Sequence, residues 1–337
     1  MAATRFSSTL DLCSLPWFDR QGDRLLVDPE VGPVADLHTH LALSYLLPSS
    51  IDLAARWPRT EHYLPVEREL NFDVYVNQNF SEDDLARMRR DLTLGSLTSG
   101  GMRRTHTIAN LLAEMGDLNI VNSCLLAIDF PALSRNAENW LEAARGRTEL
   151  ITFGSVHPYA LRMERRLDAQ VALGARGIKV HPAVQTILPS DPRAMRLYRL
   201  CGARQLPVLF HCGPVGIEPW LGRQLSQVRH YAKPIEKNPD TTFILGHSGA
   251  LQMEVALELA RAHDNVYLEL SSQSLGNVRK ILAQADPQRI VLGSDWPFYH
   301  QAIVLAKVLL ATEGDLELRH KVLYGNAARL LRLEARA

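Results

Sequence analysis

The sequence predicts a single-domain α/β protein over residues 1–337, a (β/α)8 TIM barrel with a long cap-like insertion after its first strand. Two observations predict this fold. Short apolar runs alternate with helix-like segments from about residue 119 onward, and one further apolar run lies upstream at 32–40. Continuous apolar strands separated by helices are typical of parallel strands that are buried on both faces. Eight such units, joined by right-handed crossovers, close into a barrel.

Each strand candidate is a short apolar run that ends in polar or small residues. The candidates are 32–40, 119–130, 150–158, 177–182, 207–213, 242–249, 266–272 and 289–297. Helix-like segments follow at 162–174, 191–204, 250–263, 274–285 and 299–311. Asp191 before Pro192 predicts a helix start, because aspartate caps helices and proline fits their first turn. An open doubly wound sheet is the alternative, but no glycine-rich phosphate turn follows the first strand.

Residues 41–118 form an insertion far longer than one crossover requires. Its aromatic residues argue against disorder, its segment 81–92 predicts a charged helix, and the glycine-rich 95–101 predicts a flexible loop. We therefore expect a cap over the barrel mouth. Arg103 follows the flexible loop and could hold a substrate anion, although a solvated helix start is the competing interpretation.

The composition indicates a globular protein that acts on a small molecule. Lys plus Arg and Asp plus Glu both number 37, so the zero net charge offers no electrostatic case for nucleic acid or an anionic membrane as partner. No apolar stretch is long enough to span a bilayer or to act as a signal peptide, so we expect a cytoplasmic protein. A homo-oligomer is compatible with these features. The four scattered cysteines predict reduced thiols rather than a disulfide framework.

Polar residues end the strand candidates at positions where apolar residues would otherwise be expected. His38 and His40 are two residues apart, so on a strand both side chains point to the same face. In a barrel that face can be the interior at the carboxyl-terminal mouth, where barrel enzymes keep their active sites. The same argument applies to the polar residues that end four other strands: Lys179, His181, His211, His247 and Asp295.

Imidazole and carboxylate ligands together suit a divalent metal, with zinc expected and manganese, iron or nickel comparable. Such a metal lowers the pKa of a bound water to about 7, which is hydrolytic chemistry. A single histidine near a strand end is more often a hydrogen-bonded structural residue. Several such residues at the ends of separate strands are costly to bury without partners, so we favour the metal site. Five of the other histidines are assigned structural roles: His62, His230, His263, His300 and His320.

The ordered motifs HTH, GIKVHP, PVLFHCG, FILGHSG and GSDWP resemble the amidohydrolase superfamily, most closely its amidohydrolase-2-like branch of metal-dependent TIM-barrel hydrolases. The resemblance covers about residues 33–333 and includes the closing segment YGNAARLLRL. It implies that His38 and His40 are metal ligands and that His211 and His247 are metal-binding or catalytic. It implies that Asp295 is a ligand that also takes the proton of the attacking water.

Lys179 decides the expected number of metals, one or two per chain. In binuclear relatives a lysine at this position is carbamylated and bridges two metals, and carbamylation would turn a buried amine into an anionic ligand. An ammonium that binds a substrate carboxylate is the alternative. In that case one metal remains, and His247 becomes an acid or base. His181 on the same strand is expected to contact substrate or to ligate, unless its following proline turns it outward.

Two further residues are expected near the reaction. Trp296, directly after Asp295, is predicted to shape the pocket floor, and Glu269 on the seventh strand to orient a ligating histidine. The leading hypothesis is a hydrolase of an amide, lactone or ester bond that uses a metal-activated water. A non-oxidative decarboxylase of an aromatic or unsaturated acid is the alternative enzyme. A non-catalytic ligand-binding barrel is the alternative of another class, but every expected ligand position is filled.

Overall fold

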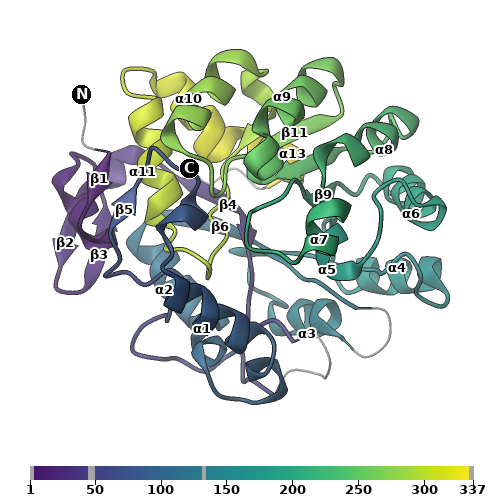
Figure 1. Ribbon diagram of the computed structural model, residues 1–337, viewed down its shortest axis with the longest axis horizontal. Helices are drawn as coiled ribbons and strands as arrows, with labels where there is room; N and C mark the ends of the chain where they lie inside the picture. The colour runs from purple at the N-terminus through teal and green to yellow at the C-terminus, as the bar shows by residue number, and fades with distance from the viewer. Residues whose placement is uncertain (1–3, 45–49, 131–133, 334–337) are drawn as a thin grey trace.

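A closed barrel of parallel strands forms the centre of the protein, in a computed structural model that describes residues 4–44, 50–130 and 134–333 (Figure 1). All eight strand candidates are confirmed. The barrel strands in chain order are β4 Val34–Thr39, β6 Ile120–Leu126, β7 Leu150–Phe153, β8 Ile178–Val180, β9 Val208–His211, β10 Phe243–Gly246, β11 Val266–Glu269 and β12 Ile290–Val291.

Backbone contacts close the sheet into a TIM barrel. Strands β4, β6 and β7 pair in parallel, as do β8 to β12 in order. Gly154 bridges to Ile178 between the two sets, and Thr39 bridges to Trp296 at the other junction. The Leu37 amide also donates to the Leu292 carbonyl at 2.9 Å. This closure rules out the open doubly wound sheet.

Helices surround the strands on the outside of the barrel (Figure 1). The Asp191 carboxylate caps α6 by accepting from the Arg193 amide at 2.8 Å, as its position before Pro192 predicts. The helix expected at 250–263 begins only at Met253, because residues 248–250 adopt positive φ angles. The helices after β6 are α3 Asn136–Ala143, α4 Met163–Ala172, α5 Pro182–Gln185, α6 Pro192–Ala203, α7 Trp220–Leu225, α8 Ala232–Lys237, α9 Met253–Ala262, α10 Leu275–Gln284, α11 Ala302–Ala311, α12 Leu316–His320 and α13 Asn326–Leu331.

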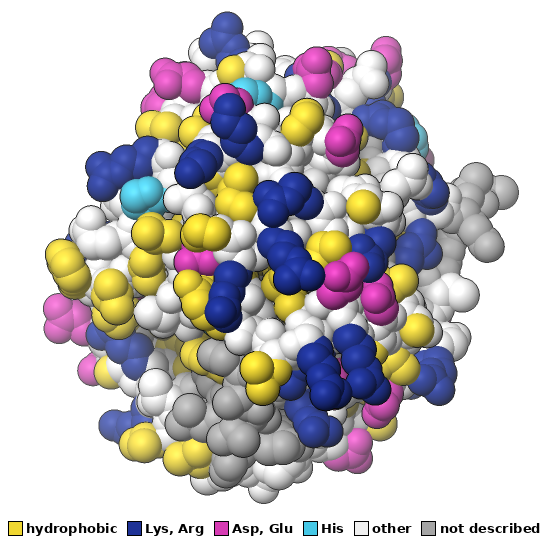
Figure 2. Space-filling model, turned by 90° about the vertical axis from the view of Figure 1, so that its right-hand side faces the viewer, with side chains coloured by type: hydrophobic (Ala, Val, Ile, Leu, Met, Phe, Trp, Pro, Cys, Tyr) yellow, Lys and Arg dark blue, Asp and Glu magenta, His cyan; other side chains and the backbone are white. Residues whose placement is uncertain are grey.

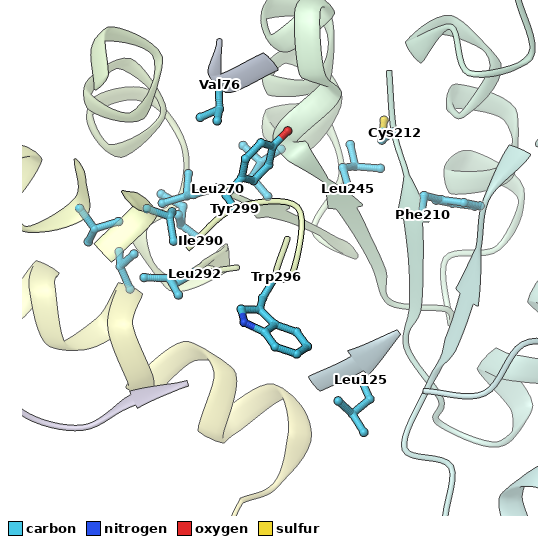
Figure 3. Close-up of a cluster of buried hydrophobic side chains, with 14 of the residues drawn as sticks. Val76, Leu125, Phe210, Cys212, Leu245, Leu270, Ile290, Leu292, Trp296 and Tyr299 are labelled. Atoms are coloured by element: carbon cyan, nitrogen blue, oxygen red, sulfur yellow. The ribbon is translucent and has the colours of Figure 1, made fainter. Parts of the chain in front are cut away.

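Two apolar clusters lie on the two sides of the strands. The inner cluster fills the barrel and includes Leu37, Phe153 and Leu209, and it packs against Tyr324 and Leu331 at the chain's end. Asn326 of this closing segment donates to the Pro287 and Ile290 carbonyls, so the segment lies against the amino-terminal end of β12. The outer cluster lies between strands and helices and includes Phe210, Leu245 and Leu292 (Figure 3). Both faces of the strands are thus buried, as parallel strands require.

The insertion after β4 is folded, and its residues 45–49 lie outside the described residues. It contains β5 Leu70–Asn71, which pairs with β1 Arg5–Phe6, and α1 Glu82–Leu92, which Ser81 and Asp84 cap reciprocally. The last part, α2 Ile108–Asp117, packs against β6 as a crossover helix. The extra structure therefore ends before α2. A short helical turn, Gly95–Leu97, forms in the expected flexible loop.

The remaining amino-terminal strands, β2 Phe18–Gln21 and β3 Arg24–Val27, form a hairpin. No helix within the described residues is long and apolar enough to cross a membrane. All four cysteines are free thiols, as predicted, and Cys124, Cys201 and Cys212 are buried. The surface carries basic, acidic and apolar side chains together on the face that Figure 2 shows.

Candidate active site

The predicted ligand residues meet at one end of the barrel. His38 lies in β4 and His40 directly follows it, while His211 ends β9 and His247 follows β10. Asp295 comes four residues after β12. Because the strands are parallel, all these positions lie at the carboxyl-terminal mouth. Each of these side chains is buried.

Hydrogen bonds orient His38 and His40 in the same way. The His38 Nδ1 atom donates to Glu269 Oε2 at 2.7 Å, and the His40 Nδ1 atom donates to the Leu126 carbonyl at 2.8 Å. A neutral imidazole that donates from Nδ1 keeps its lone pair on Nε2. Both Nε2 atoms are therefore available as ligand atoms.

These two Nε2 atoms converge on the Asp295 carboxylate. Asp295 Oδ1 lies 3.5 Å from His38 Nε2 and 3.4 Å from His40 Nε2. The ligand atoms of the three residues all lie within 4.8 Å of one another. Asp295 has a φ of 65°, a left-handed conformation that aspartate tolerates better than most residues. Its amide donates to the His38 carbonyl at 2.7 Å, which ties the aspartate to β4.

Asp36 holds the two strands that carry this triad in register. Its Oδ1 accepts from the His38 amide at 3.1 Å and from the Ser294 amide at 2.9 Å. Its Oδ2 accepts from the Ser294 hydroxyl at 2.5 Å and from the Gln301 side chain at 2.6 Å. Burial raises the pKa of Asp36 to about 6 despite these bonds. Asp36 was not predicted as a site residue, although it shares the period-two spacing of His38 and His40.

Glu269 lies behind His38, where it was expected to orient a ligand. Besides His38, its Oε2 accepts from the His247 amide at 2.9 Å and from the Ser271 hydroxyl at 2.8 Å. Burial raises the pKa of this carboxyl to about 7. Gly293 makes the approach possible, because a Cβ atom there would lie 2.3 Å from Glu269 Oε1 and 2.7 Å from the His38 Cβ.

His211 and His247 form a second pair of imidazoles beside the triad. The His247 Nε2 and His211 Nδ1 atoms are 3.1 Å apart. On its other side, the His247 Nδ1 atom donates to the Ser271 hydroxyl at 2.7 Å, and that hydroxyl donates to Glu269. This chain of bonds leaves the Nε2 lone pair of His247 facing His211.

Lys179 lies between the triad and the second histidine pair. Its side chain is 1% exposed, and its Nζ atom is 3.2 Å from His38 Nε2. Burial lowers the pKa of this amine to about 8, although Asp295 and Glu269 oppose the shift. The charge of Lys179 in turn lowers the pKa of His38, His211 and His247.

Three histidines of the site, His38, His211 and His247, are neutral at pH 7. Burial is the largest cause that holds the pKa of His38, His211 and His247 well below the ordinary range, and neighbouring cationic groups add to it. Neutral imidazole is the form that binds a metal. The site is therefore already in the protonation state that a metal requires.

His181 contributes to the cavity wall and to the start of a helix. Its Nδ1 accepts from the Val184 amide at 3.4 Å at the start of α5, and its ring stacks on His211 with centroids 3.9 Å apart. The following Pro182 does not turn the ring out of the site, because His181 lines the cavity. An Nδ1 acceptor leaves the proton on Nε2 as a donor.

A cavity of about 690 Å³ opens above these groups. This volume is in the range of small-molecule sites. His40, His211, His247 and Asp295 are its polar floor. The walls are mainly apolar and come from α1 of the insertion, the segment after β6, residues 215–222 and the segment after β12: Met88, Leu92, Ile128, Val215, Ile217, Leu221 and Phe298. The insertion thus borders the barrel mouth, as expected.

Two of the residues predicted to bind substrate do not line this cavity. Arg103 is fully buried near Asp91 and donates to the Gly95 carbonyl at 2.6 Å, so its guanidinium lies inside the insertion. Trp296 is also fully buried and lies among the hydrophobic side chains of the outer cluster (Figure 3). Phe298, two residues later, lines the cavity instead. Sequence position alone does not distinguish these neighbours, because the turn after Asp295 decides which ring faces the cavity.

Trp296 instead belongs to a second buried cluster around Glu114 of α2. The indole Nε1 donates to Glu114 Oε2 at 3.1 Å, and His62 Nε2 lies 2.9 Å from the same oxygen. His300 Nδ1 lies 3.6 Å from Glu114 Oε1. Burial, the largest single effect, acts to raise the pKa of Glu114, but electrostatic interactions and hydrogen bonds with its neighbours lower it to about 2. Both histidines were expected to be structural, and this cluster anchors the segment that follows Asp295.

The model of the amidohydrolase family matches residues 127–333. A search of curated proteins found no significant match.

Solved structures share the fold at low sequence identity. An uncharacterized TIM-barrel protein from Bordetella bronchiseptica is 16% identical, with a TM-score of 0.63 over 90% of this chain and 99% of that one. A 2,6-dihydroxybenzoate decarboxylase from Rhizobium is 14% identical, with a TM-score of 0.57 over 89% and 100%. A probable 2-pyrone-4,6-dicarboxylic acid hydrolase from Acinetobacter baumannii is 12% identical, with a TM-score of 0.53 over 67% and 89%.

Proposed function

The chain belongs to the amidohydrolase family, and we propose on that premise that it is a metal-dependent hydrolase of a C–N or C–O bond in a small molecule. The observation that carries the proposal is the convergence of two oriented imidazole Nε2 atoms on one carboxylate oxygen at the barrel mouth. Amide, lactone and ester substrates all fit this chemistry.

The donor set fits a divalent metal, and zinc is the metal we propose. His38 Nε2, His40 Nε2 and Asp295 Oδ1 would hold it, which are three protein ligands of the kind found in catalytic sites. Glu269 and the Leu126 carbonyl fix the two imidazoles from behind. When bound, the metal supplies a water of lowered pKa and polarises the substrate carbonyl.

Asp295 and His247 are the groups we propose for proton transfer. The Asp295 carboxylate lines the cavity floor, so it can accept a proton from an attacking water and pass it to the leaving group. His247 is held by Ser271 through Nδ1, so its Nε2 atom can accept a proton or bind a metal. His181, with its Nε2 proton free, can donate to a substrate oxygen.

We further propose that Lys179 reacts with carbon dioxide and that a second metal then binds. The neutral amine adds to carbon dioxide and releases a proton, which gives an anionic carbamate. The position of Lys179 between the triad and the pair of His211 and His247 supports this assignment, as does the pKa of about 8, which leaves part of the amine neutral near pH 7. Without carbamylation, one metal and a proton-carrying His247 remain.

A decarboxylase is the second candidate. Two observations favour it: 2,6-dihydroxybenzoate decarboxylase superposes over nearly the whole chain, and the cavity walls are apolar enough for an aromatic acid. One metal per chain and an unmodified Lys179 would favour this reaction over the binuclear hydrolase.

Metal analysis and product analysis test the proposal together. Purified protein should contain one or two divalent metals per chain, and mass spectrometry should detect a carbamate on Lys179 in bicarbonate buffer if there are two. A panel of amides, lactones and esters should yield acid products, whereas release of carbon dioxide from aromatic acids would support the decarboxylase. Asp295→Asn should abolish turnover while the protein stays folded, and a fully active D295N would refute the mechanism.

A further inference from the structure

A single arginine of the insertion borders the cavity. Arg89 of α1 lies at the cavity wall together with its helix neighbours Met88 and Leu92. Its Nη2 atom is 3.4 Å from the Ile217 carbonyl on the opposite wall. The side chain therefore reaches from the insertion to the loop that follows β9.

Arg89 has no ion-pair partner among the described residues. The helix positions three and four residues away hold Leu85, Ala86, Leu92 and Thr93, so no acidic side chain is in reach along α1. Asp84, the nearest acidic residue toward the start of α1, pairs instead with Arg68 and Arg87. Asp91 is buried and accepts from the Tyr63 hydroxyl and the Met102 amide. The exposed guanidinium therefore has no acidic partner among the described residues, and the Ile217 carbonyl is its one hydrogen-bond acceptor there.

The other carboxylate near the cavity rim does not compete for Arg89. Glu218 lines the cavity, its Oε1 accepts from the Val215 amide at 3.1 Å, and its buried Oε2 has no hydrogen-bond partner among the described residues. It forms no ion pair with Arg89 within the described part of the chain. Arg89 is the one arginine or lysine among the described residues that line the cavity.

We infer that Arg89 binds a carboxylate at the end of the substrate remote from the reacting bond. This inference rests on the proposed function, because it assumes that the reacting bond lies at the polar floor. The apolar walls between the floor and Arg89 then contact the body of the substrate. The substrate class is an apolar monocarboxylate with the reactive amide, ester or lactone at its other end.

A carboxylate fits this position better than a phosphate. One guanidinium makes a bidentate contact with a carboxylate and balances its single charge. A phosphate dianion would need a second cation. The bond to the Ile217 carbonyl is long and its acceptor is uncharged, so an ion pair with a ligand carboxylate displaces it readily.

Binding of simple probes to the metal-loaded protein tests the inference without turnover. Calorimetric titration would compare 3-phenylpropionate with 3-phenylpropionamide, and benzoate with benzamide, on the wild type, Arg89→Met and Arg90→Met. Arg90 is the matched control, since it is exposed on the same helix and does not line the cavity. Phenylphosphonate is the dianionic probe.

The wild type should bind each acid more tightly than its amide, and R89M should weaken acid binding by about 10- to 100-fold with little effect on the amides. R90M should bind like the wild type. Three results would overturn the inference: R89M binds the acids as tightly as the wild type, R90M loses as much acid affinity as R89M, or the wild type binds acids and amides equally well. So would a phosphonate that binds more tightly than the carboxylates through Arg89. The metal content and the activity of D295N do not depend on Arg89. These two measurements therefore test the proposed function independently of the inference about Arg89.

Discussion

Replacing Glu269 with glutamine tests whether the carboxylate behind His38 prepares the metal site. Glutamine keeps the size of the side chain but removes its charge. The carboxylate accepts from His38 Nδ1 at 2.7 Å, and it also accepts from the His247 amide and the Ser271 hydroxyl. A hydrogen bond to an ionised acceptor is roughly twice as strong as one to a neutral acceptor. E269Q therefore weakens the bond that aims His38 Nε2 at Asp295.

The expected effect is a loss of metal affinity of about 10- to 100-fold, which corresponds to about 1.4 to 2.7 kcal/mol. Burial raises the folded pKa of Glu269 to about 7, above the ordinary value of 4.5, so its ionised form costs stability at and above that pH. The metal-free fold should therefore lose no stability near pH 7 when an uncharged glutamine takes its place. Binding and folding are therefore affected differently.

Competition with a chromophoric chelator measures the zinc affinity of wild type and variant, and urea unfolding of the metal-free proteins measures stability. Tyr267→Phe is the control, because Tyr267 lies on the same strand and contacts the inner apolar cluster. Equal zinc affinity of E269Q and the wild type would show that the carboxylate does not prepare the site.

Three further predictions follow from the same contacts. Glu114→Gln should lower the free energy of unfolding by about 3 kcal/mol near pH 7, because the folded pKa of about 2 lies well below the ordinary value of 4.5. The difference from the wild type should shrink as the pH falls from 4.5 toward 2, and a difference independent of pH in urea titrations would contradict this origin. Gly293→Ala should reduce the metal content, because the new Cβ would lie 2.3 Å from Glu269 Oε1. In the control variant Gly276→Ala the nearest atom to the new Cβ is 4.0 Å away, so this variant should retain the metal. Removal of the metal with a chelator should lower the melting temperature. Compared with protein at a free metal concentration of 100 Kd, the free energy of unfolding should fall by about 2.7 kcal/mol. An unchanged melting temperature would argue against a bound metal.

The barrel and the ligand positions were accessible from the sequence because they depend on local periodicity. Strands buried on both faces appear as apolar runs, and a polar residue that ends such a run is conspicuous. The two-residue spacing of His38 and His40 places both on one face in any strand. The helix at 81–92 was accessible for a similar reason, since Ser81 and Asp84 are a local capping pair.

The substrate-facing residues were not accessible, because they depend on how the insertion packs. Arg89 and Arg103 are both arginines of the same insertion, yet one borders the cavity and the other is fully buried. Trp296 and Phe298 are two residues apart, and the turn between them directs only Phe298 to the cavity. No local pattern distinguishes these pairs.

The sequence by itself thus determined the barrel, the mouth at which its polar residues gather and the chemical type of the ligand set. Only the tertiary structure decided which nitrogen of His38 faces Asp295, because that choice depends on Glu269, which lies 231 residues further along the chain. The tertiary structure also decided that His62, His300 and Trp296 all contact Glu114 in one cluster. Hydrogen bonds between distant segments form only when the barrel closes, so their partners leave no periodic signal in the sequence.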